Sequence, residues 1–161
     1  MVDEHRDAGL REATYAILRV MAALLLLQHA LRTLFGMLQM PNATEPWEAP
    51  ALLSRDWFEG TIQLVGGVLL ALGLFTRPAA FVLSGLMAAA YFIVHSKWFA
   101  GSFFPIINRG ELAALYCFVF LYFSTAGGGR YSLDALLRGR RRSGAAVPAQ
   151  NGGVGRTAAS R

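Results

Sequence analysis

Four apolar stretches of near-bilayer length constrain this chain more than any other feature. They cover about residues 13–36, 60–76, 78–96 and 110–126. A helix crosses the hydrocarbon core of a bilayer in about 20 residues, with about 17 as the lower limit. Because lipid offers the backbone no hydrogen-bond partner, such runs are expected to be helical. The sequence therefore predicts an all-α, polytopic membrane four-helix bundle over residues 1–136.

The composition supports this fold class. The chain has 161 residues, of which 55% are hydrophobic and 16% are charged, whereas a soluble domain carries about 25% charged residues. The net charge of +5 comes from the C-terminal end, where seven arginines and one acid follow residue 129. No basic face interleaved with aromatic residues exists, so nucleic acid is not an expected partner. The single cysteine, Cys117, excludes an internal disulfide and a CxxC redox pair.

The first apolar stretch is expected to remain in the protein as a membrane span. It is longer than the apolar region of a signal peptide, and Arg19, His29 and Arg32 interrupt it. The preceding residues mix acids with bases, and no clear small-x-small cleavage site follows. The sequence therefore favours a retained first helix over a cleaved leader.

Basic residues predict the orientation of the spans. The short connection Arg77-Pro78 and the four-arginine cluster at 138–142 are rich in arginine, whereas residues 37–59 carry one arginine and four acids. Arginine and lysine favour the cytoplasmic side. We therefore expect both termini in the cytoplasm and the two longer connections, 37–59 and 97–109, outside.

The C-terminal segment, residues 137–161, is predicted to be a disordered basic tail. It is rich in glycine, alanine and arginine and has no hydrophobic periodicity. Its arginine cluster is expected to bind anionic lipids of the inner leaflet, at about 1 kcal/mol per charge close to the surface.

Polar side chains from all four spans are predicted to meet at one depth in the outer leaflet. At 1.5 Å of rise per residue, this set comprises His29, Arg32, Gln63, His95 and Glu111. Ionisable residues inside a membrane pair with each other or line a wet cavity. We therefore expect a pocket that opens outward, with Glu111 in contact with Arg32 or His29.

The predicted pocket has apolar walls and an aromatic roof, formed by residues 47–58 and 98–104. Such a pocket suits a flat, amphipathic ligand such as a quinone, and a histidine that titrates near neutrality can protonate its carbonyl. A structural interpretation stays open beside it, in which Arg32 extends to the outer head groups and Glu111 favours a helix N-terminus. We assign no catalytic or metal-ligating residue.

Two further polar residues are interpreted as architectural. Arg19 lies near the inner end of the first span, and Asp134 follows the inner end of the fourth at a similar depth. An ion pair between them would tie the ends of the chain together.

Three sequence segments resemble the DoxX family of small four-helix integral membrane proteins. They are the first helix with Arg19 and His29, LVGGVLLALGLFTRPAA from Leu64, and PIINRGELAALYCFVFLYFSTAGGGRYSLD from Pro105. The last one carries the patterns N-x-G-E and G-x-G-R-x-S-L-D. The chain departs from the family at Gln63, where a glutamate is frequent, and at Arg32, where a lysine is frequent.

The resemblance implies a bacterial cytoplasmic membrane protein linked to redox systems, including quinone-linked sulfur oxidation and oxidative-stress enzymes. One hypothesis is a quinone- or lipid-binding subunit of a membrane oxidoreductase complex. A second is a non-catalytic scaffold that recruits or stabilises a partner enzyme. A third is bis-histidine haem b binding by His29 and His95, which their different depths disfavour. The sequence leaves the substrate, the partner and the oligomeric state open.

Overall fold

The computed structural model describes residues 2–39, 46–99 and 101–145. In this part of the chain the fold is all-α, as predicted. The long helices are α1 (Val2–Phe35), α2 (Arg55–Leu72), α3 (Thr76–Ala90) and α5 (Glu111–Ala126). The remaining elements are short or terminal: a π-helical turn η1 (Tyr91–His95), a 3₁₀ turn η2 (Lys97–Phe99), α4 (Pro105–Asn108) and α6 (Leu133–Ala145).

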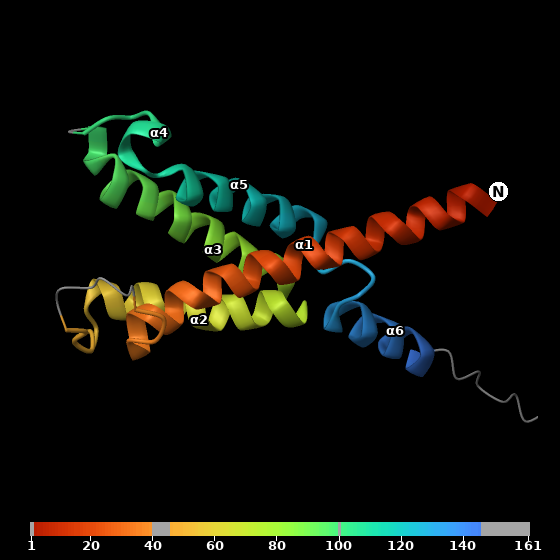
Figure 1. Cartoon of the computed structure of the whole chain (residues 1–161). Helices are drawn as coiled ribbons and strands as arrows, with labels where there is room; N and C mark the ends of the chain where they lie inside the picture. The colour runs from red at the N-terminus through yellow and green to blue at the C-terminus, as the bar shows by residue number, and fades with distance from the viewer. Residues whose placement is uncertain (1, 40–45, 100, 146–161) are drawn as a thin grey trace, which may run out of the picture.

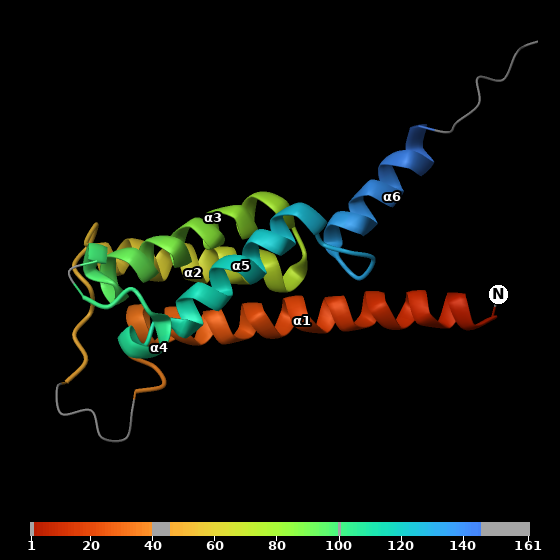
Figure 2. The same cartoon turned by 90° about the horizontal axis from the view of Figure 1, so that it is seen from above.

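The long helices pack mainly as two pairs. α1 packs along α2, and α3 packs along α5, while α2 and α3 touch less extensively. In Figure 1 the α3/α5 pair diverges from the α1/α2 pair toward the end that carries α4. We call this the α4 end and the opposite one the α6 end. The N-terminal part of α1 and the helix α6 both project from the α6 end (Figures 1 and 2).

The core joins all four long helices. Its buried members are Ala22, Ala23, Leu26, Leu70, Ala80, Leu83, Met87, Tyr116, Phe120 and Phe123. Two small residues of α2 allow neighbouring helices to approach closely. A Cβ atom on Gly66 would lie 2.7 Å from the Leu83 side chain, and one on Gly67 would lie 2.8 Å from that of Leu27.

The outer surface of the helices is strongly apolar. Ile17, Val65, Phe81 and Phe118 are more than half exposed, one on each long helix. Soluble monomers rarely expose contiguous apolar surface on this scale. Two stretches, Arg6–Phe35 and Thr76–His95, are long and apolar enough to cross a membrane, and Glu111–Ala126 is apolar but shorter.

The hairpin between α2 and α3 differs from the predicted one. The turn is formed by residues 73–75, not by Arg77-Pro78, which lie in the first turn of α3. Gly73 ends α2 in the left-handed conformation with φ 65°, as a C-terminal glycine commonly does. Pro78 fits the first turn of α3 because the amide groups there have no helical partner.

The C-terminal segment also differs from its prediction. The chain is helical in α6 up to Ala145, although we expected disorder from residue 137 onward. Residues 146–161 lie outside the described residues. Within α6, Leu133, Leu136 and Leu137 are exposed, and the arginines follow from position 138.

Candidate functional site

At the α6 end, the connection between α5 and α6 is bound to α1. Arg19 is only 2% exposed and donates hydrogen bonds to the backbone carbonyls of Gly128 and Tyr131, the latter at 2.8 Å. The Tyr15 hydroxyl donates to the carbonyl of Gly127. We call these contacts the Arg19 clamp. They satisfy backbone acceptors in a segment that has no helical partners of its own.

Asp134 binds the same connection to α3. Its two carboxylate oxygens accept hydrogen bonds from the amides of Phe75 and Thr76, both at 2.9 Å. Its own amide donates to the carbonyl of Gly73 at 2.9 Å. Burial alone would raise the pKa of this carboxyl, but the amides of Thr76 and Phe75 and the nearby Arg138 outweigh burial and lower the pKa below its usual 3.8.

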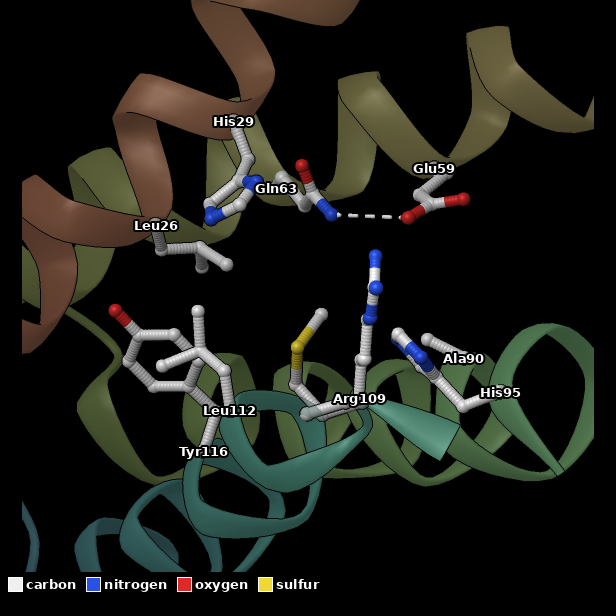
Figure 3. A pocket seen from close by; sticks show the side chains of 11 residues that line it. Leu26, His29, Glu59, Gln63, Ala90, His95, Arg109, Leu112 and Tyr116 are labelled. Carbon is white, nitrogen blue, oxygen red and sulfur yellow. Dashed lines mark hydrogen bonds between the residues drawn. The ribbon is translucent and has the colours of Figure 1, made fainter. Parts of the chain in front are cut away.

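Toward the α4 end, a cavity of about 200 Å³ lies between the two helix pairs. Every long helix contributes to its wall (Figure 3). The apolar part is formed by Leu26, Met87, Ala90, Leu112, Ala113 and Tyr116, several of which belong to the core. The polar part is formed by His29, Glu59, Gln63, His95 and Arg109. The cavity therefore has an apolar floor next to the core and a polar rim.

Within the rim, Gln63 and Glu59 lie one turn apart on α2. The Nε2 atom of Gln63 donates to Oε1 of Glu59 at 3.2 Å. Figure 3 shows the Arg109 side chain extending across the cavity toward these two residues. Gln63 is 5% exposed, and its Oε1 atom is buried with no hydrogen-bond partner among the described residues. The rim thus offers a guanidinium, a carboxylate, two imidazoles and one unpaired amide oxygen.

Local structure explains how the chain delivers Glu59 to the rim. Ser54 is the N-cap of α2, and its hydroxyl accepts a hydrogen bond from the Trp57 amide at 3.2 Å. The helix therefore begins before Glu59 and places it four residues from Gln63, on the same face.

His95 and Arg109 are positioned by irregular backbone. His95 ends the π-helical turn η1, and its Nδ1 atom lies 3.2 Å from the carbonyl oxygen of Asn108. Arg109 ends α4 with φ 59°, in the left-handed region that a non-glycine residue rarely adopts. π-helical turns and left-handed residues are both enriched at functional sites.

Comparison with known proteins identifies the family. The model of the DoxX family matches residues 14–96, which is half of the chain. The chain belongs to the DoxX family. An uncharacterized protein of Haemophilus influenzae is 56% identical over 75 residues, which are 47% of this chain and 56% of that protein. The alignment thus spans about half the length of this relative. No solved structure gives a significant match.

Three of the five predicted site residues of this DoxX chain line the cavity. They are His29, Gln63 and His95, all within the part of the chain that matches the family. Arg32 and Glu111 do not line it. Arg32 lies instead beside a separate surface hollow with Trp47, Glu48 and Asp56, and Glu111 is exposed in the first turn of α5.

Glu59 and Arg109 take the places that we assigned to Glu111 and Arg32. The sequence signal for Glu59 was the serine at position 54, a preferred N-cap residue, which moves the start of the second helix before Glu59. We had assigned Glu59 to the preceding connection. No sequence signal indicated Arg109, because its backbone is left-handed although the residue is not a glycine.

The predicted aromatic roof does not form the cavity wall. Among the described residues, Tyr116 of α5 is the only aromatic side chain in the lining. Trp57 and Phe58 belong to the first turns of α2 rather than to a loop. The predicted roof assumed a long connection that folds over the site, and α2 shortens that connection.

Arg19 and Asp134 meet the same connection from two sides. In the described part of the chain they do not form an ion pair with each other, because each binds backbone groups instead. The α5–α6 connection thus lies between α1 and α3. We predicted that Arg19 and Asp134 tie distant parts of the chain together, and this stays a prediction.

Proposed function

We propose that this DoxX protein crosses the cytoplasmic membrane four times, with both termini inside and the α4 end in the outer leaflet. The support is that α6 and the start of α1 project from one end (Figure 1) and that arginines concentrate there. Alkaline phosphatase fused after Leu137 should be inactive, and a green fluorescent protein fused there should be bright. The reverse pattern would place the α4 end inside.

We propose that the cavity binds the head group of a quinone-like, membrane-soluble ligand. The observation that carries the proposal is the polar rim over an apolar floor, with His29, His95 and Arg109 facing one space (Figure 3). A guanidinium and an imidazole can donate hydrogen bonds to ring carbonyls, and histidine can transfer a proton near neutral pH.

The size of the cavity suits a head group rather than a whole ligand. Its volume of about 200 Å³ is below the roughly 300–1,000 Å³ of clefts that enclose drug-sized molecules. A ring can occupy it while an apolar tail lies among the exposed side chains of the helices, in lipid. The same volume disfavours a haem between His29 and His95, and a preparation without a Soret band would exclude that alternative.

In this proposal the protein is a subunit of a membrane-bound redox system. It supplies the quinone site, and a membrane or peripheral oxidoreductase supplies the electrons. The polar rim at the α4 end would then lie within reach of a partner on the outer face.

The test is binding of a labelled quinone analogue to the purified protein in detergent micelles. Two variants remove rim charges, Glu59→Gln and Arg109→Ala, and two matched controls make the same changes outside the cavity, Glu111→Gln and Arg32→Ala. We expect Arg109→Ala to weaken binding about tenfold, the effect of losing one charge-assisted hydrogen bond. Glu59→Gln removes an acceptor that a quinone carbonyl cannot use, so this variant should bind the quinone analogue at least as tightly as the wild type. Both controls should bind like the wild type.

A non-catalytic scaffold is the second candidate. The observation that favours it is the projection of both α6 and the first turns of α1 from the α6 end (Figures 1 and 2), where a partner enzyme could bind. If the wild type and the four variants bind the analogue equally, or none binds it, the scaffold replaces the quinone site. A truncation after Leu133 should then abolish recruitment of the partner.

We propose that α6 lies on anionic lipids of the inner leaflet. Its exposed leucines and the arginines that follow suit a membrane surface, where each arginine contributes about 1 kcal/mol. A peptide of residues 131–145 should bind vesicles that contain phosphatidylglycerol and should not bind neutral vesicles. Added salt should release the peptide from the anionic vesicles.

A further inference from the structure

The unpaired oxygen of Gln63 indicates what the ligand must offer. An ionised carboxylate accepts hydrogen bonds only, so the amide nitrogen of Gln63 must face Glu59. The 3.2 Å bond between them therefore fixes the amide orientation. The oxygen is left on the opposite side, toward the His29 side chain (Figure 3). It is buried, and no residue in the described part of the chain donates to it.

A buried acceptor without a donor is unfavourable, and a bound donor removes that penalty. Gln63 is 95% buried, because its exposed fraction is 5%, so bulk water does not reach it freely. Beside it, Glu59 is a second acceptor in the same wall. This wall thus presents two acceptors, one on each side of the Gln63 amide nitrogen: the Gln63 oxygen and the Glu59 carboxylate. A ligand that fits the wall carries hydroxyl hydrogens.

We infer that the cavity selects the hydroquinone form of its ligand over the quinone form. The inference rests on the proposed quinone site and names the redox state that the site prefers. A hydroquinone donates two hydroxyl hydrogens, which Gln63 and Glu59 can accept. A quinone carries only carbonyl acceptors and would leave the Gln63 oxygen unpaired.

The donors of the rim do not reverse this preference. Arg109 and the two histidines can donate to the oxygen atoms of either form, because a hydroxyl oxygen also accepts hydrogen bonds. Their contribution is shared by both forms, so the difference between the forms depends on Gln63 and Glu59.

The experiment compares three ligands on the full-length protein in nanodiscs, without oxygen: a decyl-substituted benzoquinone, its hydroquinone, and the dimethyl ether of that hydroquinone. The ether keeps the ring and both oxygens but has no hydroxyl hydrogen. We expect the hydroquinone to bind about tenfold more tightly than either other ligand, which corresponds to about 1.4 kcal/mol.

The matched variant is Gln63→Met, which keeps the length of the side chain and removes the acceptor. It should bring the affinity ratio of hydroquinone to quinone close to one, and its melting temperature reports whether it folds. If it does not fold, the comparison of hydroquinone with ether on the wild type still decides.

The outcomes separate this inference from the proposed function. Binding of all three ligands with equal affinity, or tighter binding of the quinone, overturns the selectivity and leaves the quinone site in place. An unchanged ratio in folded Gln63→Met also overturns it. If none of the three ligands binds, the proposed site and the selectivity are both overturned.

Discussion

The two ends of this protein use polar groups in opposite ways. At the α6 end, two polar side chains bind backbone groups. Arg19 donates to the carbonyl of Tyr131 at 2.8 Å, and Asp134 accepts from the amides of Phe75 and Thr76 at 2.9 Å. We call this the tied end. At the α4 end, which we call the cavity end, His29 and Arg109 line a cavity, and within the described part of the chain the Gln63 oxygen has no hydrogen-bond partner. The comparison teaches that polar residues of one small membrane protein can bind backbone groups at one end and line a cavity at the other.

The largest expected effect tests the tied end. Arg19→Met removes the two hydrogen bonds that Arg19 itself donates in the Arg19 clamp and leaves the carbonyls of Gly128 and Tyr131 without them. Each bond from a charged donor contributes about 1.5–3 kcal/mol, so we expect a loss of stability of about 3 kcal/mol. The measurement is the unfolding midpoint in a fixed detergent.

The control for this change is Arg109→Met at the α4 end. Arg109 is exposed, and exposed substitutions usually change stability by less than about 0.5 kcal/mol. Equal losses of stability in Arg19→Met and Arg109→Met would contradict the difference between the tied end and the cavity end.

The next effect concerns the turn that meets the connection. Gly73 has φ 65°, and a Cβ atom there would lie 2.5 Å from the Cβ atom of Ser132. An alanine with a left-handed backbone costs about 1–2 kcal/mol, and the contact adds to it, so Gly73→Ala should lose about 2 kcal/mol. Gly85→Ala is the matched control, because nothing lies within 4 Å of its Cβ position. It should leave stability unchanged or raise it by up to about 1 kcal/mol.

The same comparison shows what the sequence could predict. The long helices follow from apolar runs of sufficient length, so the all-α fold was predictable, whereas the pairing of α1 with α2 and of α3 with α5 was not predicted. Three rim residues were predictable from depth along a helix, namely His29, Gln63 and His95. Depth alone does not tell which face of a helix a residue occupies, and Arg32 and Glu111 were therefore assigned to the wrong surroundings.

Backbone geometry explains the remaining errors. Glu59 was missed because the start of α2 depends on one capping serine rather than on hydrophobicity. The left-handed conformation of Arg109 and the π-helical turn that ends at His95 follow no local sequence pattern. The direct Arg19–Asp134 pair was expected because opposite charges at one depth suggest it, whereas backbone groups of the connection compete for both.

A smaller effect tests the α4 end itself. The Tyr91 hydroxyl donates to the carbonyl of Phe103, and the Asn108 amide lies 3.5 Å from that hydroxyl. Tyr91→Phe should cost about 1 kcal/mol and loosen the segment that carries Arg109. Hydrogen exchange should accelerate at residues 101–110 and stay unchanged at 127–132. Tyr122→Phe on exposed α5 surface is the control, and acceleration at both ends would show that the two ends are not independent.

The smallest effect is a pH dependence at the tied end. The pKa of Asp134 is lowered in the folded protein, with burial opposed by the amides of Thr76 and Phe75 and by Arg138. A lowered pKa means that the carboxylate stabilises the fold fully above the unfolded pKa, which is about 3.9. That contribution is lost as the pH falls through the lower folded pKa.

Wild-type stability should therefore decline as the pH falls below about 4, and Asp134→Asn should remove part of that decline. Because Asp134 is only partly buried, the difference at neutral pH should stay below about 1 kcal/mol. Glu111→Gln is the control for charge alone, since Glu111 is exposed in the first turn of α5. Melting curves at several pH values between 3 and 7 measure both variants. If Asp134→Asn follows the wild-type profile, the carboxylate does not support the α5–α6 connection, and the tied end depends on the Arg19 clamp alone.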